Sequence, residues 1–312
     1  MRRILVAGGA GFIGSNLCHR LIQCGHTVIC IDNFSSGNIQ NIDSLIHNKA
    51  FQLLEQDICS PISCDVDEIY HLACPASPIH YSQDPIGTLN ASFIGTQNLL
   101  RLAKNNNAKI LFTSTSEIYG DPIEHPQKES YWGNVNTVGV RSCYDEGKRV
   151  AETLCYEYRK QFDVDVKIAR LFNVYGPRMS IDDGRVIPSF ICSALENRPI
   201  IIYGDGTQTR SFIYVDDLID ALLFLMNTND NFCGPINIGN PQELAINAIA
   251  KIICKKIDTC SMVKYVNKRS DDPQKRKPDI SLANQILDWS PNIDFDLGIS
   301  KTIDYFKLML NL

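Results

Sequence analysis

The segment Ile4-Leu5-Val6-Ala7-Gly8-Gly9-Ala10-Gly11-Phe12-Ile13-Gly14 decides the fold of this chain. Its first four residues form a short apolar run, partly β-branched, which is typical of a buried strand. Three spaced glycines follow, and Leu17 and Leu21 then recur at helical spacing. The segment therefore predicts a strand, a tight glycine turn and a helix whose free N-terminal N–H groups can face a phosphate.

A second strand, predicted over residues 27–31, ends at Asp32. A carboxylate at this point can accept hydrogen bonds from both ribose hydroxyls and would repel a 2′-phosphate. Glycine turns alone are common, but here the turn lies in the order strand, turn, helix, strand and acid that a dinucleotide site requires. The sequence therefore predicts a site for NAD rather than NADP.

Strand and helix patterns alternate through the first half of the chain. Further strands are predicted over residues 51–54, 68–72, 109–113 and 166–171, and helices over residues 85–105 and 142–162. Such alternation predicts right-handed crossovers and a parallel sheet covered on both faces, with ligands at the carboxyl ends of the strands. The residues that fall at or just after such ends are Asp57, Leu72, Ala73, Thr115 and Asn173.

Length and composition fit an α/β enzyme with two unequal parts. The chain has 312 residues, 44% hydrophobic and 21% charged, enough to bury a substantial core. We predict a Rossmann-type doubly wound parallel sheet with a smaller C-terminal α/β substrate-binding domain. The NAD-binding domain is placed at residues 1–172, with a return segment at about 212–240. Residues 173–312, mainly 173–211 and 241–312, are predicted to form the substrate-binding domain.

Other functional classes receive little support from the sequence. A net charge of −5 without a sustained basic tract argues against nucleic acid. The first strand begins directly after Met1-Arg2-Arg3 and no apolar run approaches the length of a membrane span, so we expect no signal peptide, no membrane contact and a cytoplasmic location. The twelve cysteines form no Cys-x-x-Cys pair, and residues such as Cys30 and Cys254 lie in apolar runs, which favours reduced core thiols and no metal.

Two segments carry the chemistry of an alcohol oxidation. Ser114-Thr115-Ser116-Glu117 follows a strand and supplies hydroxyls and a carboxylate, and Tyr144 and Lys148 lie one helical turn apart on one face. A tyrosine beside a lysine can accept the proton of an alcohol while hydride leaves its carbon. A catalytically idle NAD-binding regulator remains an alternative, but such a protein has no reason to retain Thr115, Tyr144 and Lys148.

Beyond Asn173 the sequence changes to glycine-rich loops that carry arginines and aromatic residues. Arg178, Arg185 and Arg210 lie in separate loops, and Tyr203 begins the loop that contains Arg210. Guanidinium groups suit phosphate and carboxylate, and an aromatic ring suits a base or a sugar face. Surface salt bridges would explain any single arginine, whereas the set predicts an anionic, nucleotide-linked substrate.

Longer motifs resemble one family. They are His71-Leu72-Ala73-Cys74-Pro75-Ala76-Ser77-Pro78 and residues 113–122, 131–136, 139–148, 172–185, 203–212 and 275–280. With these motifs the chain resembles, nearly end to end, the extended short-chain dehydrogenases/reductases that act on nucleotide sugars, and within them the branch that decarboxylates UDP-glucuronate. Where the family commonly reads Lys-Thr-Asn, this chain has Asn90-Ala91-Ser92, so a lysine near substrate phosphate and a hydroxyl near the cofactor are not expected.

The resemblance implies a redox-neutral cycle that uses NAD and yields UDP-xylose. Tyr144, supported by Lys148, would take the proton of the C4 hydroxyl, Thr115 would hydrogen-bond the C4 oxygen, and the resulting 4-keto acid would lose CO₂. Related 4,6-dehydratases carry aspartate where this chain has Ser116, and serine is too weak an acid to protonate a departing hydroxyl. Glu117 and Arg276 are implied in decarboxylation and C5 protonation, with the proton donor left open.

The predicted contacts fall into two sets. We expect the chain to form a homodimer and its substrate to be UDP-glucuronate. The alternative activities are those of a UDP-sugar 4-epimerase or a nucleotide-sugar 4,6-dehydratase. The predicted cofactor contacts are Gly8, Gly11, Phe12, Ile13, Gly14, Asp32, Asn33, Ser35, Ser36, Gly37, Asp57, Ile58, Leu72, Ala73, Tyr144 and Lys148. The predicted substrate contacts are Ser77, Tyr81, Asn173, Arg178, Arg185, Tyr203, Gln208, Arg210 and Arg276.

Overall fold

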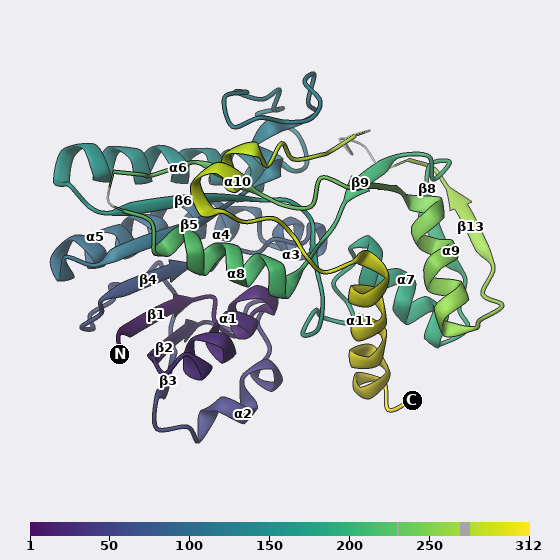
Figure 1. Cartoon of the computed structure of the whole chain (residues 1–312), viewed down its shortest axis with the longest axis horizontal. Coiled ribbons are helices and arrows are strands. Elements are labelled where there is room, and N and C mark those ends of the chain that lie inside the picture. Colours follow the sequence, from purple (N-terminus) through teal and green to yellow (C-terminus); the bar gives the residue numbers. More distant parts are fainter. Residues whose placement is uncertain (230, 269–274) are drawn as a thin grey trace.

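The computed structural model of the chain describes residues 1–229, 231–268 and 275–312. Within them, a seven-stranded sheet with the order β11-β6-β5-β4-β1-β2-β3 forms the centre of the molecule (Figure 1). Every neighbouring pair in this sheet is parallel, as the alternation predicts. Its strands are β1 (Arg3–Ala7), β2 (Thr27–Asp32), β3 (Phe51–Glu55), β4 (Glu68–His71), β5 (Lys109–Thr115), β6 (Val166–Leu171) and β11 (Ile236–Ile238).

Both faces of the sheet are covered by helices, because successive strand residues point to opposite sides. In β1, Ile4 and Val6 belong to one buried cluster, which they share with residues of α1 (Phe12–Gln23) and α8 (Val215–Met226). Leu5 and Ala7 belong to a second cluster on the other face, packed by α5 (Thr96–Asn106) and α6 (Ser142–Phe162). Figure 1 shows the two helical layers on either side of the strands.

The helix predicted over residues 85–105 is present, but it is not uniform. It begins as α4 (Pro85–Asn90), passes through one π-helical segment, η2 (Ala91–Gly95), and continues as α5. The Asp84 side chain caps its start by accepting a hydrogen bond from the Gly87 N–H at 2.8 Å. Insertions of this kind are frequent near functional sites, and this one leads the helix past the sheet edge where ligands are expected.

A second group of elements gathers beside the sheet, on the right in Figure 1. Three small two-stranded pairs link its segments, and helices pack against them through a buried cluster continuous with the α1 and α8 side of the sheet. The pairs are β7 (Val174–Tyr175) with β10 (Ile213–Tyr214), β8 (Ile200–Tyr203) with β13 (Val263–Val266), and β9 (Thr209–Ser211) with β12 (Glu243–Ala245). The helices are α7 (Val186–Leu195), α9 (Ile246–Ile257) and α11 (Phe295–Met309).

Short elements complete the described chain. They are η1 (Ile39–Asn41), α2 (Asp43–Ile46), α3 (Pro78–Gln83), η3 (Ser116–Tyr119) and α10 (Ser281–Leu287). Helix α8 and strand β11, which the patterns did not predict individually, lie within the segment at about 212–240 that was expected to return to the first domain. The division into two domains with those boundaries stays a prediction.

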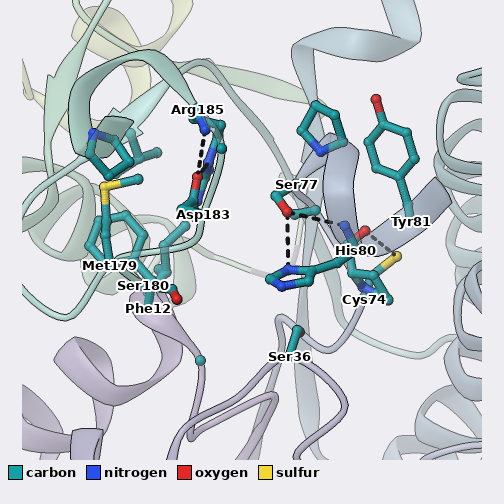
Figure 2. A pocket seen from close by; sticks show the side chains of 18 of the residues that line it. Phe12, Ser36, Cys74, Ser77, His80, Tyr81, Met179, Ser180, Asp183 and Arg185 are labelled. Carbon is teal, nitrogen blue, oxygen red and sulfur yellow. Dashed lines mark hydrogen bonds and ion pairs between the residues drawn. The ribbon is translucent and has the colours of Figure 1, made fainter. Parts of the chain in front are cut away.

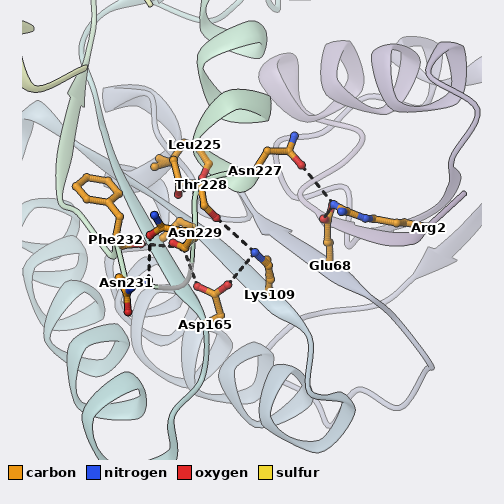
Figure 3. A network of polar contacts seen from close by, with 11 residues as sticks. Arg2, Glu68, Lys109, Asp165, Leu225, Asn227, Thr228, Asn229, Asn231 and Phe232 are labelled. Atoms are coloured by element: carbon orange, nitrogen blue, oxygen red, sulfur yellow. Dashed lines mark hydrogen bonds and ion pairs between the residues drawn. The ribbon is translucent and has the colours of Figure 1, made fainter. Parts of the chain in front are cut away.

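A polar network fixes the amino ends of the strands, at the edge of the sheet opposite the ligand edge (Figure 3). The Lys109 ammonium lies 3.1 Å from the Asp165 carboxylate. Lys167, fully buried, lies 2.8 Å from the same carboxylate and donates hydrogen bonds to the carbonyl oxygens of Asn229 and Phe232 at 2.7 and 2.8 Å. These contacts fasten the loop after α8 to β5 and β6, so this edge of the sheet has a structural role.

All twelve cysteines are free thiols. Cys30 is fully buried between strands and helix, and Cys254 packs against the core while partly exposed. Within the described residues, no group of three or more histidine, cysteine or acidic side chains is arranged to hold a metal ion. In the same part of the chain, every helix is too short or too polar to cross a membrane.

Candidate active site

A cavity of about 1100 Å³ lies at the carboxyl ends of the sheet strands, between the sheet and the second group of elements. Every residue predicted from the sequence to bind cofactor, bind substrate or take part in catalysis lines this cavity. The fold therefore brings together segments from residue 8 to residue 276. The role of each individual residue stays a prediction, and the local geometry decides which roles are chemically reasonable.

The glycine turn between β1 and α1 leaves no room for side chains. The N–H of Gly8 donates to the carbonyl oxygen of Ile31 at 2.8 Å, and Gly8 has a φ of 78°. A Cβ on Gly14 would lie 2.0 Å from the carbonyl oxygen of Gly8, and a Cβ on Gly8 would lie 2.8 Å from the backbone of Ala73. Helix α1 starts without a side-chain cap, so its N-terminal N–H groups fit the phosphates of a dinucleotide.

Asp32 ends β2 at the wall of the cavity. Its carboxylate accepts hydrogen bonds from the N–H groups of Ala10 and Phe34, each at 2.9 Å, so the turn holds it in one position. Burial raises the pKa of Asp32, and these N–H groups partly offset that effect. A Cβ on Gly37 would lie 2.7 Å from Asp32 Oδ1, which brings the loop after β2 close to the carboxylate. The arrangement fits an adenosine ribose with free 2′ and 3′ hydroxyls.

Tyr144 and Lys148 project from the first turns of α6. The Tyr144 ring stacks on the Tyr81 ring with 5.3 Å between centroids and 9° between planes. Lys148 donates a hydrogen bond from Nζ to the carbonyl oxygen of Thr113 at 2.9 Å, and this nitrogen lies 5.9 Å from the centre of the Tyr144 ring. Both side chains are buried, so their relative position is well defined.

The environment of Tyr144 decides when it can act as a base. Burial raises the pKa of its hydroxyl strongly, while a hydrogen bond with the Thr115 side chain opposes that effect. Burial also lowers the pKa of Lys148. A phenolate at this position therefore needs positive charge beside it, which Lys148 and the oxidised nicotinamide of a bound NAD would supply.

Glu117 lies between two arginines. It follows β5 in the short helix η3, forms an ion pair with Arg276 and accepts from Arg141 Nη2 at 2.5 Å. Burial alone would raise the pKa of Glu117, but the charges of Arg276 and Arg141 outweigh it and lower the pKa to about 2. Arg276 is 2% exposed and also donates to the carbonyl oxygen of Gly120 at 2.6 Å. Glu117 is thus a carboxylate at neutral pH.

The end of β5 places three successive polar side chains at the cavity wall. Thr115 caps η3 by accepting a hydrogen bond from the Glu117 N–H at 3.2 Å, and Ser116 is 2% exposed. Strand residues alternate between faces, but the turn into η3 after Thr115 breaks that alternation. This local turn is why Thr115, Ser116 and Glu117 all line the same cavity.

Polar residues of the opposite walls surround the remaining space (Figure 2). Arg185 Nη2 donates to Asp183 at 2.6 Å, and this pair faces Ser77, whose hydroxyl is 3.0 Å from His80 Nδ1. Ser77 also caps α3, which holds Tyr81 against Tyr144. Farther along, Gln208 donates to the carbonyl oxygen of Tyr203 at 2.7 Å, which closes the loop that presents both residues.

Arg178 lies close to the cofactor half of the cavity. Its Nη1 donates to the Asn16 side chain of α1 at 2.6 Å, and its backbone φ is 73°. The sequence analysis grouped Arg178 with the substrate contacts, and that assignment stays a prediction. Arg141 was not predicted at all, although it lies inside the motif of residues 139–148, because only the fold shows that it reaches Glu117.

Comparison with known proteins places the chain in a family. Residues 4–239 match the model of the NAD dependent epimerase/dehydratase family. The chain belongs to this family, which confirms the class that its motifs resemble. UDP-glucuronic acid decarboxylase 1 of Arabidopsis thaliana is 50% identical over 305 residues, 98% of this chain and 70% of that protein. UDP-glucuronic acid decarboxylase 1 of Xenopus tropicalis is 49% identical over 306 residues, 98% of this chain and 72% of that protein.

Solved structures support the same fold and cofactor. UDP-glucuronic acid 4-epimerase from Bacillus cereus, in complex with UDP-glucuronic acid and NAD, is 32% identical with a TM-score of 0.89, covering 98% of this chain and 99% of that one. UDP-glucose 4-epimerase from Thermotoga maritima is 28% identical with a TM-score of 0.89, covering 99% of both chains. The prediction of NAD as the cofactor is thereby confirmed, and the glycine turn and Asp32 are the residues that fit it.

Proposed function

We propose that this chain is a UDP-glucuronate decarboxylase, which converts UDP-glucuronate to UDP-xylose and CO₂ without net oxidation. The observation that carries the proposal is the ion pair of Glu117 with the buried Arg276 at the same cavity wall as Tyr144 and Lys148. A fixed positive charge that could pair with a substrate carboxylate therefore lies in the same cavity as the two residues that we propose oxidise the alcohol. The names of the relatives at about 50% identity support the same substrate.

Oxidation at C4 begins the proposed cycle. Tyr144 removes the proton of the C4 hydroxyl, and Thr115, which bonds to the same phenol, holds the C4 oxygen. The glycine turn and Asp32 would hold NAD, which would supply the acceptor for the C4 hydride and the donor for its return. Lys148, anchored to Thr113, keeps a positive charge near the tyrosine throughout.

Loss of CO₂ follows from the chemistry of the oxidised sugar. A keto group at C4 makes the C6 acid a β-keto acid, so breaking the C5–C6 bond leaves an enolate that the C4 oxygen stabilises. Arg276 can hold the carboxylate before it leaves and can offset the negative charge that develops. Ser116 fits this outcome because a carboxylate leaves as CO₂ and needs no acid, whereas a departing hydroxyl would need one.

The test is to incubate the purified chain with UDP-glucuronate and catalytic NAD. We expect CO₂ release, a product with the mass of UDP-xylose, and no stoichiometric NADH. Formation of UDP-galacturonate without CO₂ would establish a 4-epimerase instead, and stoichiometric NADH would contradict the redox-neutral cycle. Absence of any turnover, with NAD and substrate both bound, would favour the idle regulator.

We also propose that the chain forms a homodimer through α4, η2 and α6. These elements pack on one another at the surface and leave apolar side chains exposed. The side chains are Ile86, Leu89, Phe93, Val150 and Tyr156, of which Ile86 is 69% and Tyr156 56% exposed. A face of this kind fits a second copy of itself across a two-fold axis.

Light scattering tests this proposal. It should give twice the chain mass for the wild type and the mass of the monomer for Phe93→Lys. A monomeric wild type would contradict the proposal.

A further inference from the structure

The proposed decarboxylation, on which this inference rests, consumes one proton from solvent in every turnover. The C5–C6 bond breaks with its electron pair left on the sugar, and a new C5–H bond forms. Tyr144 cannot supply that proton, because the proton that it takes from the C4 hydroxyl returns to the C4 oxygen when the keto group is reduced. A route from water to C5 must therefore exist.

A second cavity, of about 360 Å³, lies directly behind the wall that carries Glu117. Glu117, Arg141 and Arg276 line both this cavity and the substrate cavity, so these three side chains form the partition between them. On the outer side the second cavity is lined by residues exposed to solvent, among them Asn134 and Asn136. A polar space of this size has room for several water molecules.

Asp145 belongs to the second cavity and not to the substrate cavity. It follows Tyr144 on α6 and is 7% exposed, and within the described residues its Oδ1 is buried without a hydrogen-bond partner. Buried carboxylate oxygens are normally satisfied by donors, so a carboxylate that served only the fold would be expected to have partners. A carboxyl oxygen without a donor, beside a polar cavity that has room for water, can bind a proton and exchange it with that water.

The charges around Asp145 favour the protonated acid. Burial raises its pKa and the Glu117 carboxylate raises it further, whereas the guanidinium groups of Arg141 and Arg276 lower it. Glu146 adds a further small increase, and the result is a pKa of about 7. Among the described residues, Tyr81, Tyr144 and Cys143 also face Asp145 and are neutral at that pH, and the side chains of Asp121 and Lys268 line the same cavity. Asp145 therefore exchanges protons in the neutral range, while Glu117 does not.

We infer that Asp145 holds the proton that replaces CO₂ at C5, and that it passes this proton through the second cavity and the Glu117 partition. In this step the Asp145 O–H gives its proton to a cavity water, and a water at the partition gives a proton to the C5 enolate. Glu117 stays a carboxylate, paired with Arg276 and Arg141, and orients that water by accepting a hydrogen bond from it. Asp145 regains a proton from solvent at the outer end of the cavity, so one solvent proton enters C5 for each CO₂ that leaves.

The inference is tested with Asp145→Asn, which keeps the shape of the side chain and removes its acid. Single-turnover measurements with UDP-glucuronate separate the rise of NADH, which reports hydride transfer, from its decay, which follows C5 protonation. We expect an unchanged rise and a decay slower by about 10²-fold. In the wild type the decay rate should fall as the pH rises through about 7, because the acid form of Asp145 is lost, and in the variant this dependence should disappear.

Glu146→Gln is the matched control, since Glu146 is the next residue and lies 3.7 Å from Arg149 on the outer side of α6. It should keep the wild-type decay rate at low pH, with the pH dependence retained and shifted only slightly toward lower pH, because Glu146 makes a small contribution to the raised pKa of Asp145. Asp145→Glu, which restores an acid one methylene longer, should recover part of the decay rate. An Asp145→Asn variant with wild-type decay, or one that slows the rise and the decay equally, would overturn the inference.

The wild-type measurement stands even if the variant fails to fold. A decay rate that is independent of pH between 6 and 8 would by itself overturn a relay through Asp145, given a pKa of about 7. The proposed function fails separately, since a wild-type chain that releases no CO₂ from UDP-glucuronate contradicts the decarboxylase whatever Asp145 does. If the wild type forms UDP-xylose and the Asp145→Asn variant shows the same NADH decay as the wild type, only the relay through Asp145 is contradicted.

Discussion

The ammonium group of Lys148 is anchored to the main-chain carbonyl oxygen of Thr113 by a hydrogen bond of 2.9 Å, with both residues buried. Thr113 lies in β5, the strand whose end carries Thr115. The central sheet and helix α6 therefore hold the lysine and the tyrosine in one geometry, without help from a ligand. This contact fixes the position of the positive charge on which the proposed proton removal by Tyr144 depends.

Replacing Lys148 with methionine should slow hydride transfer by about 10²-fold or more, because burial then disfavours the Tyr144 phenolate with less opposing charge. The measurement is the single-turnover rise of NADH with UDP-glucuronate. Lys104→Met, which removes a surface ammonium near the Phe162 ring, is the control and should leave that rate unchanged. Equal rates of NADH formation in the two variants would show that Lys148 takes no part in the proton transfer.

Tyr144→Phe should abolish C4 oxidation while UDP-glucuronate still binds. The ring that stacks on Tyr81 remains and only the proton acceptor is lost, which typically costs about 10²- to 10⁴-fold in rate. Calorimetry should give an unchanged affinity for the nucleotide sugar, and stopped-flow absorbance should show no fast NADH phase. Wild-type turnover in this variant would show that another group is the base.

The preference for NAD should depend on Asp32. In Asp32→Ala the affinity for NAD should fall and the gap to NADP should narrow, because the carboxylate that favours a ribose diol and opposes a 2′-phosphate is gone. Loss of the hydrogen bonds from Ala10 and Phe34 will weaken both cofactors, so the ratio of the two dissociation constants is the informative quantity. Equal wild-type affinities for NAD and NADP, measured by calorimetry, would refute the role of Asp32.

Arg276→Ala should impair the steps after hydride transfer more than hydride transfer itself. The variant loses one of the two arginine partners of Glu117 and the contact to Gly120, and with them the charge that we propose holds the substrate carboxylate. A single-turnover rise of NADH with UDP-glucuronate should remain, with little UDP-xylose formed. UDP-glucose, which lacks the carboxylate, is the control and should be affected less. Formation of UDP-xylose at the wild-type rate would show that Arg276 is not needed for decarboxylation.

Lys167→Met should destabilise the fold without altering the affinity for substrate. Removing the fully buried ammonium leaves two carbonyl oxygens without their donor and Asp165 with only Lys109 as an ion-pair partner, which we expect to lower the free energy of unfolding by about 3–5 kcal/mol. Lys109→Met, in which a 31% exposed side chain is removed from the same carboxylate, should cost about 1 kcal/mol or less. Urea unfolding measures the free energy of unfolding of both variants. Equal losses would show that the burial of Lys167 does not make its contacts more stabilising than those of Lys109.

Much of the fold could be predicted because its signals are local. The strand at 166–171 and the helix at 142–162 begin and end where the apolar spacing placed them. The pattern was less informative at residues 91–95, where the helix carries a π-helical segment, and at β11, whose three residues are too few for a strand period to be visible. Short edge elements owe their conformation to the neighbour on which they pack.

The sequence by itself determined the glycine turn, the acid that ends β2 and the pairing of Tyr144 with Lys148, because each depends on the spacing of residues within one or two adjacent elements. It also placed Ser116 and Glu117 directly after a strand. Only the tertiary structure decided that Arg276 and Arg141 hold Glu117 from two sides, and that Asp145 lies beside a second cavity behind it. Contacts and cavities of this kind are made by residues far apart in the chain, so their geometry and their pKa values follow from packing and burial rather than from any local pattern.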